Sequence, residues 1–316
     1  MAGGGNAVYI FALPQQSEAH SHVHREDPML TRNAVYTFAI VVGLACCGTL
    51  ALAQAPNQAV TTKKIKDNIY LVEGGGGGSG IIIGQNGVIV IDAKTTPGAG
   101  KAVVDEVRKL TNKPITTVIF THSDADHVNG IVSFPKGLTI IAHENDRKEI
   151  EQAEAAGANG APPKDLLPNK IVTGMRESDT IDGVKMTLIH IAPAHTSGDL
   201  AVYLPDDKIV FSGDLIGNGD PLIHRNKHGE SQGWIQFVSA LVQLDADTFV
   251  LAHADPMTKA QVQANLKSAE DKRAKIAGLV KEGKSLDQIK QAFGEASAPA
   301  GRFPSFTETT YEELSK

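Results

Sequence analysis

The segment FTHSDADHVNG, residues 120–130, places imidazoles and carboxylates at tight spacing directly after a short apolar run. Its potential donors are His122, Asp124, Asp126 and His127. Imidazole and carboxylate together suit zinc, iron or manganese, and a catalytic site leaves one coordination position open for water. The segment therefore predicts a metal site.

Further candidate donors follow later in the chain. Asp214 ends KIVFSGD and His253 ends TFVLAH, while His195 lies in the loop sequence APAHTSGD. Because ligands in open α/β structures gather beyond the carboxyl ends of strands, we expect one shared site. Seven donors suffice for two ions with a bridging carboxylate and a bridging hydroxide. They are His122, Asp124, Asp126, His127, His195, Asp214 and His253.

Five segments in order, VIVIDAK, THSDADHVNG, APAHTSGDL, FSGDL and LAHAD, carry a family resemblance. They resemble the metallo-β-lactamase-fold hydrolases, whose hallmark is His-x-His-x-Asp-His followed by separate His, Asp and His ligands. The resemblance runs from about Ile65 to Asp255. It implies an α/β fold, a four-layer αββα sandwich with the metals at one edge of the facing sheets.

The resemblance also implies roles for individual residues. Asp126 is expected to act in catalysis as well as in metal binding, and Asp92 to brace the loop through hydrogen bonds to backbone N–H groups without binding metal. The implied ligands are His122, Asp124 and His195 for the first ion, Asp126, His127 and His253 for the second, and Asp214 as the bridge.

Two positions depart from the family pattern. Asp124 stands where His is usual, and LAHAD stands where Gly-His-Gly is usual. An extra carboxylate makes the first ion a weaker Lewis acid and reduces attraction for anionic substrates, which favours a neutral acyl group over a phosphodiester. It is also a harder ligand, which moves metal preference from zinc toward iron or manganese. The alternative is that Asp124 only caps the helix that follows.

Four other histidines match no metal position in the family. We expect surface or supporting roles for them, and expect the LIHRNKHGESQGW loop to border the substrate. They are His143, His190, His224 and His228.

Periodicity predicts the elements that position these residues. IKDNIYLVE is interpreted as one strand, and EGGGGGSG as a hairpin turn or a close approach to a ligand. Strands followed by a helix recur in both halves, and the segment after Ser297 is expected to be irregular. Helices are predicted over 98–110, 144–156 and 234–244, with Ser285 capping a later one.

The composition of the chain limits the partners that it can bind. The 316 residues carry a net charge of −6 without basic blocks, which argues against nucleic-acid binding.

The N-terminal segment indicates the location of the protein. From Met29 a basic residue, an apolar stretch and small residues predict a secretory signal, with an uncleaved membrane anchor as the alternative. Both cysteines fall inside that signal, so the remaining chain has no disulfide or thiolate site. We expect a leader, disordered or untranslated, over 1–28, a signal peptide over 29–53, the metallo-β-lactamase-fold domain over 63–264, and a helical extension packed on it over 265–316.

The predicted function is a periplasmic or secreted hydrolase without stable membrane association after signal cleavage. A metal-bound hydroxide would attack an acyl, ester or amide carbon of a small molecule such as a β-lactam or a lactone. Two divalent ions are expected, with zinc as the first choice and iron or manganese as alternatives. The competing hypotheses are a di-iron redox enzyme on the same fold and a non-catalytic metal-binding relative.

Overall fold

The computed structural model describes residues 59–295 and 303–316. The expected leader and signal peptide lie outside these residues. Within the described ranges, no helix combines the length and the apolar character needed to cross a bilayer.

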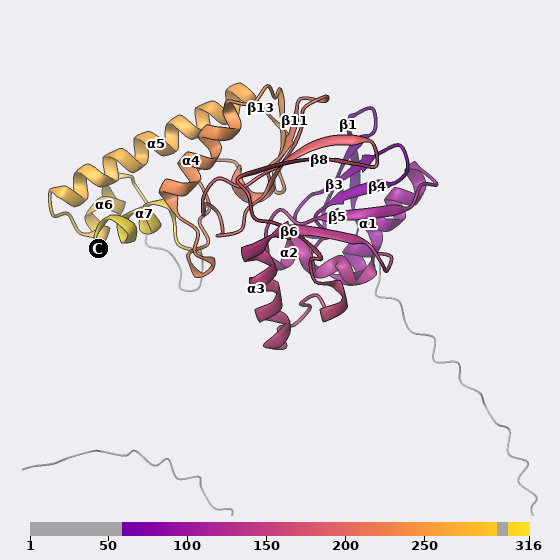
Figure 1. Ribbon diagram of the computed structural model, residues 1–316. Coiled ribbons are helices and arrows are strands. Elements are labelled where there is room, and N and C mark those ends of the chain that lie inside the picture. The colour runs from indigo at the N-terminus through magenta and orange to yellow at the C-terminus, as the bar shows by residue number, and fades with distance from the viewer. Residues whose placement is uncertain (1–58, 296–302) are drawn as a thin grey trace, which may run out of the picture. The chain divides into compact units, whose positions relative to one another are not determined.

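Two β-sheets pack face to face, and helices cover the outer side of each (Figure 1). This arrangement confirms the predicted αββα sandwich. The first sheet has the order β1 (Thr61–Lys66), β2 (Ile69–Glu73), β3 (Ser79–Ile83), β4 (Val88–Ile91), β5 (Ile115–Ile119), β6 (Thr139–His143), β7 (Lys170–Val172). The second has the order β13 (Met257–Thr258), β12 (Thr248–Val250), β11 (Ile209–Phe211), β10 (Ala201–Leu204), β9 (Val184–Ile189), β8 (Arg176–Ile181).

Strand β4 shows why an unbroken apolar run forms a central strand here. All four residues of VIVI are buried. Because successive side chains point to opposite faces, both faces of the strand are covered. Ile89 and Ile91 pack between the two sheets, while Val88 and Val90 pack in the cluster under the outer helices.

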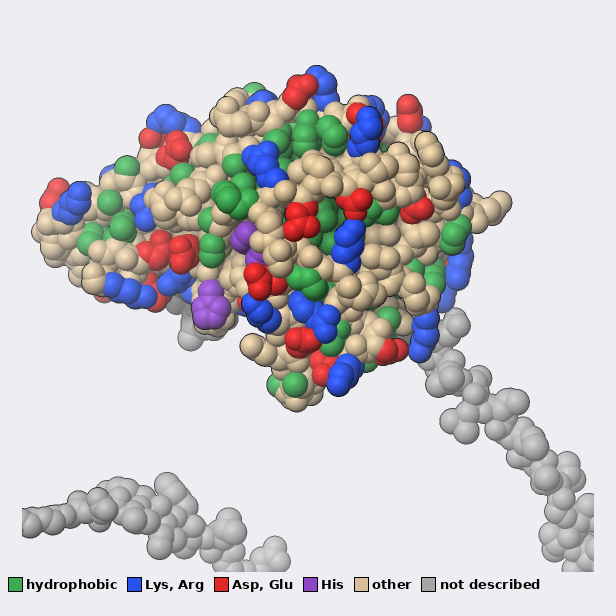
Figure 2. All heavy atoms as spheres, viewed as in Figure 1, with side chains coloured by type: hydrophobic (Ala, Val, Ile, Leu, Met, Phe, Trp, Pro, Cys, Tyr) green, Lys and Arg blue, Asp and Glu red, His purple; other side chains and the backbone are tan. Residues whose placement is uncertain are grey.

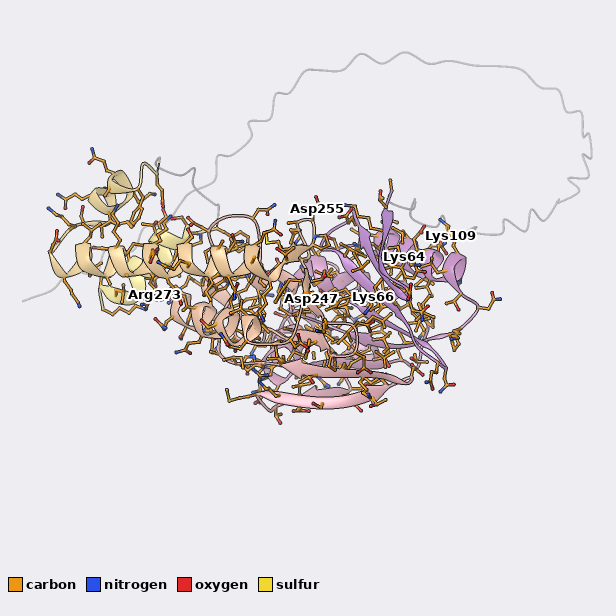
Figure 3. The ribbon with its side chains drawn as sticks, turned by 90° about the horizontal axis from the view of Figure 1, so that it is seen from above. Lys64, Lys66, Lys109, Asp247, Asp255 and Arg273 are labelled. Atoms are coloured by element: carbon orange, nitrogen blue, oxygen red, sulfur yellow. The ribbon has the colours of Figure 1, made fainter. Side chains whose placement is uncertain are left out.

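The helices complete the outer layers. Residues of α1 (Pro97–Leu110) and α3 (Glu144–Ala155) pack on the first sheet, and residues of α4 (Ser231–Val242) and α5 (Lys259–Lys281) on the second. Seen from above, Lys109 of α1 and Arg273 of α5 lie on opposite sides of the sheets (Figure 3). The remaining helices are α2 (Ala125–Val128), α6 (Leu286–Ala292) and α7 (Phe306–Leu314), with short 3-10 turns η1 (Asn129–Ser133), η2 (Lys164–Leu166), η3 (Gly213–Leu215) and η4 (Arg225–Lys227).

Two sequence-based expectations were wrong. IKDNIYLVE is not one strand, because the chain turns at 67–68 and β1 pairs antiparallel with β2. Ile65 and Ile69 keep the same phase on either side of the turn, which hides it from periodicity, although Asp67 and Asn68 are typical turn residues. The end of the chain is not irregular, since α7 begins after Ser305, whose hydroxyl accepts the N–H of Glu308. The Ser285 cap of α6 is confirmed, and α5 runs unbroken across residue 265.

Helix α7 packs against α4. Phe306 is buried in the cluster that α4 and α5 form on the second sheet. The Glu313 carboxylate accepts hydrogen bonds from the backbone N–H and the hydroxyl of Ser231, the first residue of α4. One turn later, the Trp234 indole donates to the Leu215 carbonyl oxygen, next to Asp214. The carboxyl end of the chain is thereby tied to the segment that carries Asp214.

His143, at the end of β6, is a buried histidine away from the predicted ligands. Its ring stacks on His190 with centroids 3.9 Å apart, and its Nδ1 accepts the N–H of Asn145 at the start of α3. Burial and the neighbouring His190 lower the pKa of His143 to about 4, with Lys148 acting in the same direction and Glu144 and Glu177 against it.

A histidine that resists protonation in the fold makes stability depend on pH. Between pH 6.5 and about 4 the unfolded chain binds a proton that His143 in the fold does not, so stability falls as pH falls. His143→Asn keeps a capping acceptor but does not titrate. We expect the wild type to lose about 2 kcal/mol relative to His143→Asn between pH 7 and 4.5, measured by urea unfolding. His228→Asn, at an exposed position, is the control, and parallel profiles for wild type and His143→Asn would contradict the prediction.

Candidate metal centre

The predicted donors come together at one edge of the sandwich, from loops that leave both sheets. Asp92 and His122 follow the parallel neighbours β4 and β5 of the first sheet. Asp214 and His253 follow the parallel neighbours β11 and β12 of the second. Since parallel neighbours end at the same edge, the four side chains are delivered to one place. His195 joins them from the loop between β9 and β10.

Three imidazoles are buried and oriented by their Nδ1 atoms. His127 Nδ1 lies 2.8 Å from an Asp92 carboxylate oxygen, His195 Nδ1 2.9 Å from the Leu222 carbonyl oxygen, and His122 Nδ1 3.1 Å from the Thr121 hydroxyl. Fixing Nδ1 leaves each Nε2 to face the site, as metal-binding histidines require. Figure 2 shows histidine side chains on the viewed face, but the three oriented rings are themselves buried, with 1% exposure or less.

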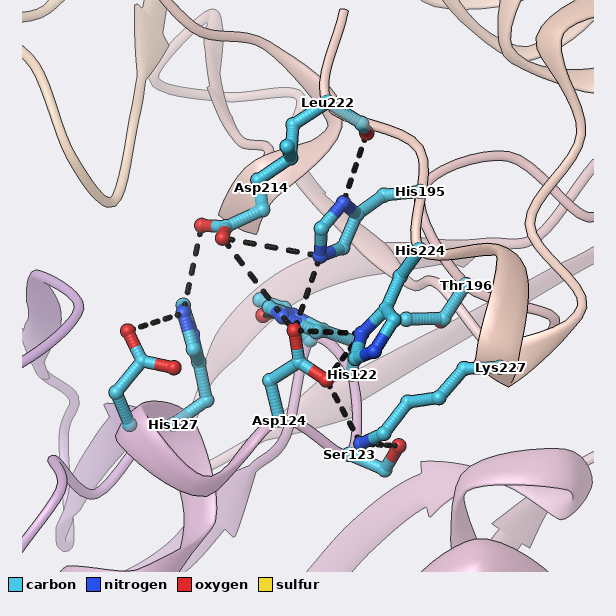
Figure 4. A network of polar contacts seen from close by, with 12 residues as sticks. His122, Ser123, Asp124, His127, His195, Thr196, Asp214, Leu222, His224 and Lys227 are labelled. Atoms are coloured by element: carbon cyan, nitrogen blue, oxygen red, sulfur yellow. Dashed lines mark hydrogen bonds and ion pairs between the residues drawn. The ribbon is translucent and has the colours of Figure 1, made fainter. Parts of the chain in front are cut away.

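The first cluster contains His122, Asp124, His195 and one oxygen of Asp214 (Figure 4). Asp124 Oδ2 lies 3.4 Å from His122 Nε2 and 3.1 Å from His195 Nε2. Asp214 Oδ2 lies 3.9 and 3.8 Å from the same two nitrogens. Four donor atoms of this cluster therefore surround one small volume.

The second cluster contains Asp126, His127, His253 and the other oxygen of Asp214. Asp126 Oδ2 lies 3.6 Å from His127 Nε2 and 3.1 Å from His253 Nε2. Asp214 Oδ1 lies 3.3 and 3.4 Å from those nitrogens. Asp214 thus turns one oxygen to each cluster, the arrangement of a bridging carboxylate.

The donor atoms fit two metal ions. Ligands about 2 Å from a tetrahedral zinc ion lie roughly 3.3 Å from one another, which is close to the spacing in both clusters. Within the described residues, His122 Nε2, His127 Nε2 and Asp214 Oδ1 are buried without a hydrogen-bond partner. Buried polar atoms are rarely left unpaired, so these three atoms indicate a missing partner at the centre of the clusters.

Asp124 does not act as a helix cap. It occupies the N-cap position of α2, but its side chain makes no capping hydrogen bond. Its carboxylate turns instead toward His122 and His195. The alternative that Asp124 merely caps the helix is therefore wrong.

Two residues of the LIHRNKHGESQGW loop also reach Asp124. His224 Nδ1 lies 3.1 Å from Asp124 Oδ1, and Lys227 Nζ lies 2.7 Å from the same oxygen. His224 forms with Asp124 and His195 a third group of donor atoms close enough together to hold an ion, and sequence reasoning did not pair it with Asp124. Lys227 was missed altogether, because only the tertiary fold brings its loop beside residue 124.

Asp92 braces the site as expected. Its Oδ1 accepts the backbone N–H of Thr121, and its Oδ2 accepts the Thr121 hydroxyl and the His127 ring. The glycine-rich hairpin contributes a close approach, because a Cβ on Gly77 would lie 2.5 Å from His127 Cε1. Only glycine lets the backbone pass this ring.

The carboxylates and imidazoles of the clusters shift each other's charge. Burial alone would raise the pKa of Asp214, but the positive charge and close approach of the surrounding imidazoles hold it well below its usual range. Hydrogen bonds with Asp126 and Asp214 raise the pKa of His253 to about 10. Burial opposes protonation of His195, yet its hydrogen bond with Asp124 and nearby carboxylates raise its pKa to about 9. The negative charge of the ionised carboxylates therefore favours the protonated form of the neighbouring imidazoles.

The surroundings of the clusters differ in polarity. Leu222 and Phe303 are apolar side chains that are 41% and 45% exposed, and the Phe303 ring meets His224 edge-on at 4.8 Å. A polar pocket of about 460 Å³ lies between α3 and the His224 loop, and its lining includes Lys148 and Lys227. Lys227 therefore faces both Asp124 and this pocket.

The sequence model of the metallo-beta-lactamase superfamily matches residues 68–253. The chain belongs to this superfamily. The match spans both clusters and each predicted donor. The superfamily includes β-lactamases and alkylsulfatases and typically binds divalent metals, often zinc, which supports a metal-dependent hydrolase role.

Curated relatives are distant. The 2,4-dinitroanisole O-demethylase subunit alpha of Nocardioides sp. (strain JS1661) is 24% identical over 233 residues, 73% of this chain and 69% of the relative. A type 2 metallo-beta-lactamase of Elizabethkingia meningoseptica is 25% identical over 192 residues, 58% of this chain and 72% of the relative.

A solved structure of a stereoselective inverting sec-alkylsulfatase from Pseudomonas sp. is similar in fold. Its TM-score is 0.64 at 18% identity, and the match covers 81% of this chain and 50% of that one. The chain thus spans about half the length of that alkylsulfatase. At this identity the likeness shows the fold alone.

Proposed function

We propose that this chain is an exported hydrolase with two divalent metal ions that cleaves an ester, acyl or amide bond of a small molecule. The position of Asp214, with one oxygen facing each donor cluster, carries the proposal. Bound ions would supply Lewis acidity and an activated water. The sequence of residues 29–53 supports export.

The ligand assignment follows the two clusters. His122, Asp124 and His195 hold the first ion, and Asp214 bridges to the second. On the second side, His253 and Asp126 have side chains that are 49% and 32% exposed, whereas the other imidazoles of the clusters are buried. Substrate therefore approaches from the side of the second cluster, where Asp126 is placed to orient it. The second ion is held by Asp126, His127 and His253.

The substrate we propose has an apolar portion beside its scissile bond. Leu222 and Phe303 offer exposed apolar surface on the His224 side of the centre. β-Lactams, lactones and simple carboxylic esters fit this description. Sulfate esters are a second candidate, because Lys227 places an ammonium 2.7 Å from the Asp124 carboxylate and offsets its charge.

Metal removal tests the proposal. The full chain is assayed with nitrocefin, a lactone, p-nitrophenyl butyrate and an aryl sulfate, before and after treatment with a strong chelator. We expect hydrolysis of at least one substrate, at least about a 100-fold loss after chelation, and recovery on adding zinc, manganese or iron. A mock-treated sample is the control. Activity that survives chelation, or no hydrolysis with any metal, would refute the proposal.

Elemental analysis of the purified protein separates the remaining alternatives. Two zinc ions per chain would exclude the di-iron redox enzyme. Two irons would favour it, in keeping with the harder carboxylate ligand at position 124. One ion or none after reconstitution would favour a non-catalytic relative.

A further inference from the structure

The two oxygens of Asp124 differ in every partner but one, because His224 Nδ1 also lies 3.3 Å from Oδ2. Oδ2 faces His195 Nε2 and His122 Nε2 at 3.1 and 3.4 Å. Oδ1 faces Lys227 Nζ at 2.7 Å and His224 Nδ1 at 3.1 Å (Figure 4). One oxygen is therefore turned to the first cluster, and the other is held from outside it.

The loop that supplies the outer partners is fixed to the cluster by backbone hydrogen bonds. The N–H of His224 donates to the His195 carbonyl oxygen at 2.7 Å, and the N–H of Ser197 donates to the Lys227 carbonyl oxygen at 2.8 Å. A Cβ on Gly229 would lie 2.2 Å from the His195 carbonyl oxygen, so the chain passes as closely as glycine allows. His195 and the two partners of Asp124 are thus positioned together.

The charges of this group also match. The Asp124 side chain is only 13% exposed, and a carboxylate in such a place is stable when a counter-charge lies beside it. Lys227 supplies that charge, and it also donates to the Ser123 hydroxyl and lies 3.7 Å from Glu149. The negative charge that Asp124 adds to the first metal site is therefore offset by an ammonium that touches it.

We propose that Lys227 and His224 are positioning residues for Asp124, and that Asp124 and Lys227 work as a unit in which neither is useful alone. Lys227 and His224 hold Oδ2 of Asp124 toward the first ion. The ammonium of Lys227 also offsets the negative charge that the Asp124 carboxylate adds to the site. The reduced attraction for anionic substrates expected from Asp124 alone is thereby cancelled. This inference rests on the proposed two-metal centre.

A double-mutant cycle on metal affinity tests the pairing. Zinc dissociation constants and stoichiometry are measured for the full chain by competition with a chromophoric chelator and by elemental analysis. The variants are Lys227→Met, Lys227→Arg, Asp124→Ala and the double variant of Asp124→Ala with Lys227→Met. Lys148→Met is the matched control, because Lys148 lines the same pocket but pairs with Glu144.

We expect Lys227→Met to weaken one of the two zinc constants by about 10- to 100-fold, as loss of an outer partner of a ligand does. Lys227→Arg keeps the charge and should stay within a few-fold of the wild type. In the Asp124→Ala background the sign reverses: removing Lys227 strengthens zinc binding, because an ammonium without its carboxylate repels the ion. His224→Phe, which keeps a ring against Phe303, should cost about tenfold.

Two results would overturn the inference. One is Lys227→Met with both zinc constants unchanged. The other is an equal loss from Lys227→Met in the wild-type and Asp124→Ala backgrounds, since a merely structural role gives no sign reversal. Failure of the proposed hydrolase function can be distinguished from failure of this inference. In that case the wild type binds two ions and the cycle behaves as expected, but no substrate of the panel is cleaved.

Discussion

Replacing Asp214 with alanine is expected to remove both metal ions and to lower kcat/KM by at least about 10³-fold, roughly 4 kcal/mol of transition-state stabilisation. The reason is its geometry, because Oδ1 faces the second cluster and Oδ2 the first. The other predicted ligands serve one cluster each. The measurement is metal stoichiometry by elemental analysis together with steady-state kinetics on whichever substrate the panel identifies.

A control separates this effect from a general loss of acidic charge. Asp220 is an exposed acid six positions later that pairs with Lys272, and Asp220→Ala should leave metal content and kinetics near the wild type. Asp214→Ala that retained one ion at wild-type affinity would show that Asp214 serves only one cluster.

Replacing Asp92 with asparagine is expected to abolish tight binding of the second ion while the fold persists. Asp92 Oδ1 accepts the Thr121 N–H, which an amide oxygen can also do, but Oδ2 accepts from His127 Nδ1. An amide nitrogen at that place donates toward Nδ1, which forces the ring proton onto Nε2, the atom that faces the second cluster. We expect at least a 10- to 100-fold weaker second zinc constant, measured by chelator competition.

Asp92→Ala provides the matching comparison. It removes the acceptor of the buried Thr121 N–H and of the His127 ring, and it places alanine at a backbone φ of 62°. We expect a loss of about 3 kcal/mol in the free energy of unfolding, measured in urea. Asp92→Asn should lose clearly less stability. An Asp92→Asn protein that binds two zinc ions as tightly as the wild type would refute the tautomer argument.

The sequence predicted the layered fold because its signals are local. Apolar strands such as VIVI are buried on both faces, and donors that follow such strands reach the same edge of a sheet. His122, Asp214 and His253 are brought together for that reason, whereas His195 comes from the loop between β9 and β10. Asp124, Asp126 and His127 follow His122 in the same segment. The turn at 67–68 was missed because the apolar residues on its two sides keep the same phase, although Asp67 and Asn68 are turn-forming residues.

What remained hidden depends on contacts between distant segments. The approach of Lys227 to Asp124 spans 103 positions and is set by backbone hydrogen bonds of the His195 segment, which no spacing rule encodes. Helix α7 is short, and it is stabilised by Phe306 in the cluster of the second sheet and by Glu313 on Ser231. The predicted helical extension over 265–316 included this stretch, and Ser305 with Glu308 is a capping-box signal, but the segment after Ser297 was still expected to be irregular.

The docking of α7 on α4 makes the last residues of the chain part of the support of the metal centre. Glu313 is bonded to the start of α4, and Trp234 of α4 is bonded to Leu215, the neighbour of the bridging Asp214. Proteolytic trimming at this end, or a bulky C-terminal fusion that displaces α7, would release α4 and loosen the segment that presents Asp214.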